Sequence, residues 1–115
     1  MRKTLSITRN SLFRRLYAKG RAASSFDIIV YTLPNRSGGN RLGITVSTKV
    51  GKAVVRNRIR RRIKEAYRTV EMHIPDGVNM VIVARSAAKD RTMPQIRESL
   101  VKLLQKNNLW VNSDE

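Results

Sequence analysis

Residues 49–68, KVGKAVVRNRIRRRIKEAYR, decide the fold more than any other stretch of the chain. The segment holds nine of the 24 Lys and Arg residues and a single acid, Glu65. Its apolar residues recur at spacings of three and four, which is typical of a helix with one buried face. They are Val55, Ile59, Ile63, Ala66, Tyr67 and, just past the segment, Val70. The pattern predicts a cationic helix that is anchored to a folded core and holds its basic side chains in fixed directions.

The basic side chains of this predicted helix lie on both borders of its apolar face, at about 100° per residue. One border carries Arg56, Arg60, Lys64 and Arg68, whereas Arg58, Arg61 and Arg62 lie at the back and on the other border. A helix that is merely solvent-exposed mixes both charge signs, but this one leaves like charges repelling unless a polyanion neutralises them. The two basic flanks indicate either two partner surfaces or one partner that wraps around the helix.

The whole chain is strongly basic, with a net charge of +16 over 115 residues and Arg outnumbering Lys by sixteen to eight. A guanidinium group binds phosphate through two hydrogen bonds and stacks on bases. This composition therefore favours a nucleic-acid partner, and RNA rather than DNA, over an acidic protein or a membrane surface. The length predicts a single domain over residues 1–115, with enough apolar residues for one core.

Several classes of protein are excluded by what the sequence lacks. The chain has no cysteine, so it has neither disulfides nor thiolate metal sites. The first ten residues lack the apolar run of a secretory signal, and no stretch approaches the roughly 20 apolar residues of a membrane span. We therefore expect a cytoplasmic protein.

The acidic residues argue against a catalytic site within the chain. A protein nuclease needs clustered carboxylates for metal ions, or a general acid and a general base across the scissile phosphate. The eight acids are scattered, and His73 is the only histidine. The sequence leaves open whether His73 or an acid binds a metal ion, but it predicts no catalytic residue and no cofactor bound by the protein.

The rest of the chain predicts a small α+β sandwich. Asn10 is a suitable N-cap for a short first helix that Gly20 ends. Two strands over residues 26–33 and 41–47 follow, separated by a flexible loop, and we expect them to pair antiparallel. After the basic helix come a turn at residues 75–77, an apolar strand at 78–84 and a last helix that Pro94 opens.

One face of the two early strands has an unusual composition. Alternation places Ile29 and Tyr31 on this face of the first strand, and Gly43 and Thr45 on that of the second. If the first helix and the border of Arg60 and Lys64 enclose the face, they form a cleft with stackable rings and a cationic wall. Such a cleft suits an extended single strand of nucleic acid. The alternative is that Phe13, Tyr17 and Tyr31 are ordinary core aromatics.

The run KAVVRNRIRR at residues 52–61, preceded by LGITVSTKVG at 42–51, resembles the signature of the bacterial ribonuclease P protein subunit. The resemblance extends through Asn10, Phe13, Tyr17 and Gly20 of the first helix and through the strand segments 31–33 and 81–85, so it covers nearly the whole chain. Tyr17 stands where phenylalanine is common in this family. The resemblance implies a four-stranded sheet in αβββαβα order with a left-handed crossover around the basic helix.

The same resemblance implies two RNA partners, which are the catalytic ribonuclease P RNA and precursor tRNA, whose 5′ leader is removed. The RNA subunit, with Mg²⁺, is expected to carry the chemistry. By matched position, the residues implied to dock on the catalytic RNA are Arg56, Asn57, Arg58, Arg61 and Arg62, supported by Lys49, Lys52 and Arg68. Those implied to line a cleft for the leader are Phe13, Tyr17, Ile29, Tyr31, Thr45, Arg60 and Lys64. Asn57 could instead serve the first turn of the helix.

Three alternatives belong to other functional classes. A ribosomal protein would share the size and charge, and would co-sediment with ribosomal subunits. A self-sufficient nuclease would cleave RNA without an RNA partner, which the scattered acids oppose. A helix that reads the major groove of DNA is disfavoured because neither a dimerisation element nor a helix-turn-helix accompanies the basic helix.

Overall fold

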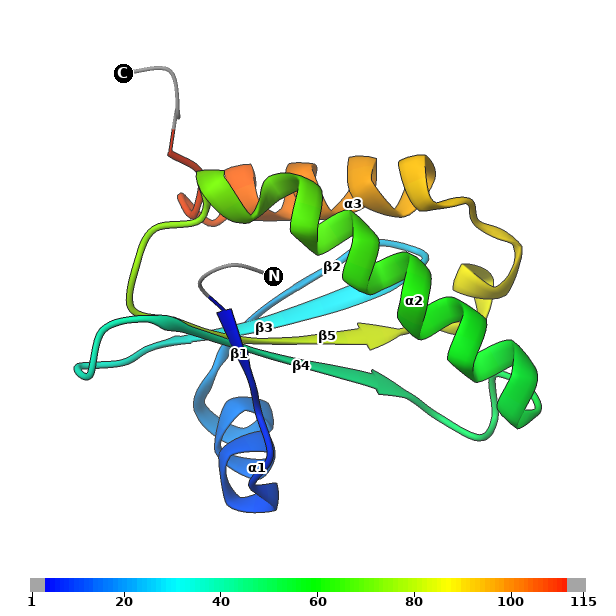
Figure 1. Ribbon diagram of the computed structural model, residues 1–115, viewed down its shortest axis with the longest axis horizontal. Helices are drawn as coiled ribbons and strands as arrows, with labels where there is room; N and C mark the ends of the chain where they lie inside the picture. The colour runs from blue at the N-terminus through cyan, green and yellow to red at the C-terminus, as the bar shows by residue number, and fades with distance from the viewer. Residues whose placement is uncertain (1–3, 112–115) are drawn as a thin grey trace.

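The fold is taken from a computed structural model, which describes residues 4–111. It is a five-stranded sheet with one helix on one face and two helices on the other (Figure 1). In chain order, the elements are β1 (Thr4–Ser6), α1 (Asn10–Lys19), β2 (Arg21–Ser24), β3 (Ile28–Pro34), β4 (Asn40–Val46), α2 (Ala53–Val70), the 3₁₀ helix η1 (Glu71–His73), β5 (Val78–Ala84), the 3₁₀ helix η2 (Ser86–Asp90) and α3 (Met93–Lys106).

The α+β class and the unusual crossover are confirmed. The strands lie in the order β1-β4-β5-β3-β2, and the neighbours β4 and β5 are parallel. The helix α2 joins them over one face of the sheet, and the connection is left-handed (Figure 1). Nearly all such connections in proteins are right-handed. Apart from β1, the order is the αβββαβα order that the family resemblance implies.

Two predictions about the sheet are wrong. The sheet has five strands instead of four, because β1 pairs parallel with residues 40–42 of β4. The strands β3 and β4 do not pair with each other, since β5 lies between them, antiparallel to β3 and parallel to β4. The physical reason is burial: six of the seven β5 residues are buried, so this most apolar strand takes the centre of the sheet.

The apolar stripes of α2 and α3 pack on the same face of the sheet. Ile59, Ile63, Ala66, Tyr67 and Val70 of α2 are buried as predicted, and Val55 is partly buried against them. The helix α3 contributes Ile96, Leu100, Leu103 and Leu104. These side chains meet the inner face of the strands, which includes Val30, Met80 and Ile82. The basic side chains of α2 are therefore anchored to the main core.

Two predicted helix starts shift by a few residues. The basic helix begins at Ala53 with Lys52 as its cap, so Lys49 lies in the preceding turn. In α1, Asn10 is the first helical residue rather than the cap, and the cap residue, Arg9, makes no side-chain capping bond. Gly20 does end α1, and glycine is required there because a Cβ would collide with the carbonyl oxygen of Leu16.

Candidate nucleic-acid interface

The helix α1 crosses the sheet on the face opposite α2 and α3 (Figure 1). The chain enters it beside β4, where the Ile7 N–H donates to the Leu42 carbonyl at 3.0 Å. It leaves beside β3, where Gly20 lies against the Thr32 carbonyl. Leu16 of α1 is fully buried between these points, in a small second core with Ile7 and Val81. The helix α1 thus divides this face of the sheet into two halves.

Three aromatic rings gather where α1 meets the sheet. The rings of Phe13 and Tyr17 have centroids 6.4 Å apart, and Tyr17 meets Tyr31 edge-on at 5.1 Å. The Tyr17 hydroxyl forms a 2.8 Å hydrogen bond with Oγ1 of Thr45. Phe13 and Tyr31 are partly buried against the second core, whereas Tyr17 is 40% exposed. The rings therefore contribute to the core and also present stackable surface.

Ile29 lies on the same half of the face as Thr45. In the sheet register Ile29 is opposite Val83, and Val83 is opposite Thr45, so the three side chains form one row across the sheet. All three are partly exposed. The row extends the aromatic cluster with a narrow, partly open apolar surface.

Two basic residues of α2 reach the same region across the edge of the sheet. Because β1 pairs only with residues 40–42, it leaves the later part of β4 uncovered on that side. A hollow of about 360 Å³, here named the edge hollow, lies there. It brings Phe13 of α1 together with Arg60 and Lys64 of α2, which come from opposite faces of the sheet. Its lining residues are Ser6, Ile7, Phe13, Leu42, Gly43, Ile44, Arg60, Arg61 and Lys64.

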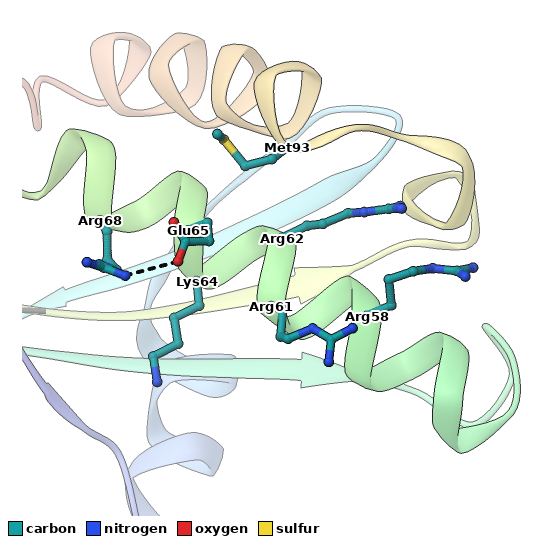
Figure 2. A pocket seen from close by; sticks show the side chains of 7 residues that line it. All are labelled: Arg58, Arg61, Arg62, Lys64, Glu65, Arg68 and Met93. Carbon is teal, nitrogen blue, oxygen red and sulfur yellow. Dashed lines mark hydrogen bonds and ion pairs between the residues drawn. The ribbon is translucent and has the colours of Figure 1, made fainter.

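A second basic hollow of about 560 Å³, the outer groove, lies between α2 and the start of α3 (Figure 2). Figure 2 shows Arg58 and Arg62 extending side by side toward the segment before α3, while Lys64 points down toward β4. Arg62 donates to the Arg91 carbonyl at 2.9 Å. The groove is lined by Arg58, Arg61, Arg62, Lys64, Glu65, Arg68 and Met93.

The edge hollow and the outer groove share two lining residues on α2. Arg61 and Lys64 line both of them, so the two basic flanks of α2 meet at these residues. Glu65, the only acid on α2, pairs with Arg68 at 3.0 Å. The remaining basic residues of α2 therefore carry no neutralising charge from their own helix.

The other residues that the sequence predicts to bind the catalytic RNA lie near the start of α2 and do not line the outer groove. Arg56 donates from Nε to the Gly51 carbonyl at 3.2 Å. Asn57 accepts from Arg60 at 3.2 Å through its side-chain oxygen, and it lies past the first turn, so it does not serve the helix start. Lys49 and Lys52 are exposed just before the helix.

Arg58 carries an unusual polar atom. Its Nε is buried and has no hydrogen-bond partner within residues 4–111. A buried donor without an acceptor destabilises a structure. The same part of the chain contains no group of three or more acidic or histidine side chains placed to hold a metal ion. It also contains no helix long and apolar enough to cross a membrane.

The chain is similar to known proteins over most of its length. The family model described as Ribonuclease P matches residues 1–108. The ribonuclease P protein component of Clostridioides difficile is 39% identical over 110 residues, covering 95% of this chain and 96% of that protein. The RNase P protein of Staphylococcus aureus superposes with a TM-score of 0.77 at 35% identity, covering 91% of this chain and 96% of that one. That of Thermotoga maritima gives a TM-score of 0.74 at 28% identity, over 85% and 91% of the two chains.

Proposed function

Since the chain belongs to the ribonuclease P protein family, we propose that it binds the catalytic RNA of ribonuclease P and the 5′ leader of precursor tRNA, and so promotes endonucleolytic removal of the leader. The observation that carries the proposal is the edge hollow, which joins Phe13 of α1 to Arg60 and Lys64 of α2. We propose that the complex of this protein with its RNA subunit acts in the cytoplasm.

The leader is proposed to lie along the half of the sheet face that carries Tyr17, Thr45 and Ile29. Bases of a single strand stack on aromatic side chains, with about 1 to 3 kcal/mol for each stacked base. Tyr17 is the most open of the three rings, and Tyr31 supports it from the sheet. The cationic side chains of Arg60 and Lys64 neutralise leader phosphates at the edge of the sheet. Mature tRNA has no leader, so this contact distinguishes substrate from product.

The catalytic RNA is proposed to dock on the start and outer side of α2. The outer groove supports this assignment, because Arg58 lines it and a guanidinium group can bind a phosphate through two hydrogen bonds. Arg61 and Arg62 line the same groove, and Arg56 and Asn57 lie one turn earlier. Because Arg61 also lines the edge hollow, the two RNAs would approach each other across one helix.

The chemistry is proposed to belong to the RNA subunit with its Mg²⁺ ions. The protein contributes position and charge. Basic side chains between two RNA backbones lower the repulsion between them, and they thereby strengthen binding of the leader and of divalent ions near the cleavage site. The scattered acids of the chain are consistent with this division of roles.

The test is cleavage of a 5′-labelled precursor tRNA at low Mg²⁺ concentration. The protein alone, a bacterial ribonuclease P RNA alone and the two together are compared. We expect cleavage at the mature 5′ end only, or far faster, in the mixture. Cleavage by the protein alone would move the chemistry into this chain. A correctly folded mixture that gains nothing over the RNA alone would reject the proposal and favour a ribosomal or general RNA-binding role.

A further inference from the structure

A third basic hollow lies at the start of α1, on the half of the sheet face away from Tyr17. It has a volume of about 540 Å³ and is named here the α1 pocket. Three arginines and three hydroxyl side chains make up all but one of its lining residues. These residues are Thr8, Arg9, Ser11, Leu12, Arg15, Ser37 and Arg41. None of the site residues predicted from the sequence lies in it.

The arginines of the α1 pocket have no partner among residues 4–111. Among residues 4–111, the side chains of Arg9, Arg15 and Arg41 form no hydrogen bond, ion pair or ring contact, and all three residues are exposed. Asp76 lies near the loop at residues 36–39, but it accepts the Gly39 N–H at 3.1 Å and does not line the pocket. Three guanidinium groups thus converge on one hollow without an acid that neutralises them.

The chemistry of the lining residues fits phosphate. Guanidinium groups bind phosphate oxygens through paired, charge-assisted hydrogen bonds, and the hydroxyl groups of Thr8 and Ser11 are further donors. The first turn of α1 also contains no acid, and its cap residue makes no side-chain capping bond. A phosphodiester group would therefore supply acceptors to three guanidinium groups that can only donate.

The position of the α1 pocket indicates which RNA supplies the phosphate. It shares a wall with the edge hollow, because three pairs of consecutive residues divide between the two: Ile7 and Thr8, Leu12 and Phe13, and Arg41 and Leu42. A strand that leaves the edge hollow past the start of α1 arrives at Arg9 and Arg41. The helix α2, which carries most residues of the outer groove, lies on the opposite face of the sheet from α1 (Figure 1).

We propose that the α1 pocket binds phosphates of the 5′ leader that lie beyond the nucleotides held at the edge hollow. The inference rests on the proposed function, because it assumes that the edge hollow holds the leader. A phosphate site in the α1 pocket would make the affinity for precursor tRNA depend on leader length. A short leader ends before the pocket, whereas a longer one reaches Arg9, Arg15 and Arg41.

The experiment measures the affinity of the reconstituted holoenzyme for three ligands. They are mature tRNA, a precursor with a leader of about 4 nucleotides and a precursor with a leader of about 12 nucleotides. Both leader lengths lie within the range of about 4 to 16 nucleotides that single-strand binding sites cover. Wild type is compared with the double variant Arg9→Gln/Arg41→Gln. The control is Arg14→Gln/Lys19→Gln, which removes the same charge from two exposed positions of α1. Neither residue lines any of the three hollows.

We expect Arg9→Gln/Arg41→Gln to lower affinity for the long-leader precursor about tenfold, while affinity for the short-leader precursor and for mature tRNA stays at the wild-type value. The slope of log affinity against log salt for the long leader should also fall by about 1.4, since each phosphate neutralised on a single strand contributes about 0.7. The control should match wild type for all three ligands. The thermal midpoint of each variant confirms that it is folded.

Three results would overturn the proposal. Unchanged affinity for the long leader would show that the α1 pocket holds no leader phosphate. An equal loss for all three ligands would show only a general effect of charge. A loss in direct binding of the catalytic RNA, with leader dependence intact, would assign the pocket to that RNA. The wild-type holoenzyme tests the proposed function separately from the α1 pocket. If it binds the short-leader precursor no more tightly than mature tRNA, the proposed function itself fails.

Discussion

The ring of Phe13 lies against Gly43 so closely that a Cβ at position 43 would be 2.6 Å from Cε1 and 2.7 Å from Cζ of the ring. Both distances are far inside van der Waals contact. The ring comes from α1 and the glycine from β4, 30 positions later in the chain. Glycine at position 43 therefore provides the space for Phe13 beside the uncovered edge of the sheet.

Gly43→Ala is expected to displace the Phe13 ring and to destabilise the fold by about 1 to 3 kcal/mol, the usual effect of overpacking. It should also weaken binding of precursor tRNA by the holoenzyme and spare mature tRNA. Adding Phe13→Leu relieves the clash, so the double variant should regain stability without regaining affinity for the precursor. Full affinity in Gly43→Ala would show that the position of this ring does not matter for the leader.

Two substitutions at Tyr17 separate its ring from its hydroxyl. Tyr17→Phe removes only the hydrogen bond with Thr45, which is exposed, so the change in precursor affinity should be small. Tyr17→Ala removes the stackable ring and should weaken precursor binding by about 1 to 3 kcal/mol. Both are measured with precursor and mature tRNA. An equal effect of the two variants would contradict a stacking role.

Asp27 is a fully buried carboxylate that links the turn before β3 to the helix α3. It pairs with Nε of Arg91 at 3.1 Å and accepts from the Ser99 hydroxyl at 2.9 Å. Asp27→Asn leaves Arg91 without its counter-charge, and urea unfolding should show a loss of about 3 kcal/mol. The control is Glu98→Gln in the exposed pair with Lys102, which should change stability by less than about 1 kcal/mol. Similar losses for both would refute the structural role of Asp27.

Burial, with a smaller contribution from the charge of Glu71, raises the pKa of Tyr67 to about 12 despite the opposing hydrogen bond with Thr4. The unfolded chain loses this proton near pH 10, and the folded protein keeps it until about pH 12. The contribution of Tyr67 to stability is therefore complete below pH 10 and falls by about 1.4 kcal/mol for each pH unit between 10 and 12. Tyr67→Phe should remove this part of the pH dependence in unfolding measurements. A wild-type slope in the variant would show that the tyrosine does not titrate in this way.

The basic residues of the outer groove should govern the salt dependence of binding to the catalytic RNA. Arg58→Gln/Arg62→Gln should lower affinity and reduce the slope of log affinity against log salt by about 2, or about 1 for each phosphate that the protein no longer neutralises. Lys102→Gln/Lys106→Gln on α3 removes the same charge at positions that do not line the groove. If both variants reduced the slope equally, the contribution of charge would be general and not local.

The position of β5 illustrates what sequence patterns could not predict. Residues 78–84 are a buried strand in both the prediction and the structure. The prediction paired β3 with β4 because they are neighbours in the chain, whereas β5 lies between them. Strand pairing depends on which surfaces bury the most apolar area together, and that is a property of the whole chain. The short strand β1 was missed because three residues carry too little periodic signal.

The sequence by itself determined the elements whose signals are local. Spacings of three and four predicted which side chains of α2 are buried, and its charge pattern predicted a polyanion-binding helix. The family signature predicted the chain order of the later strands and helices and the left-handed crossover. Only the tertiary structure decided that Phe13 meets Arg60 and Lys64 at one edge, that Arg61 lines two hollows, and that Arg9, Arg15 and Arg41 converge on a third. Periodicity places a residue on a face of its own element, whereas the distance between two elements is set by packing against the shared sheet.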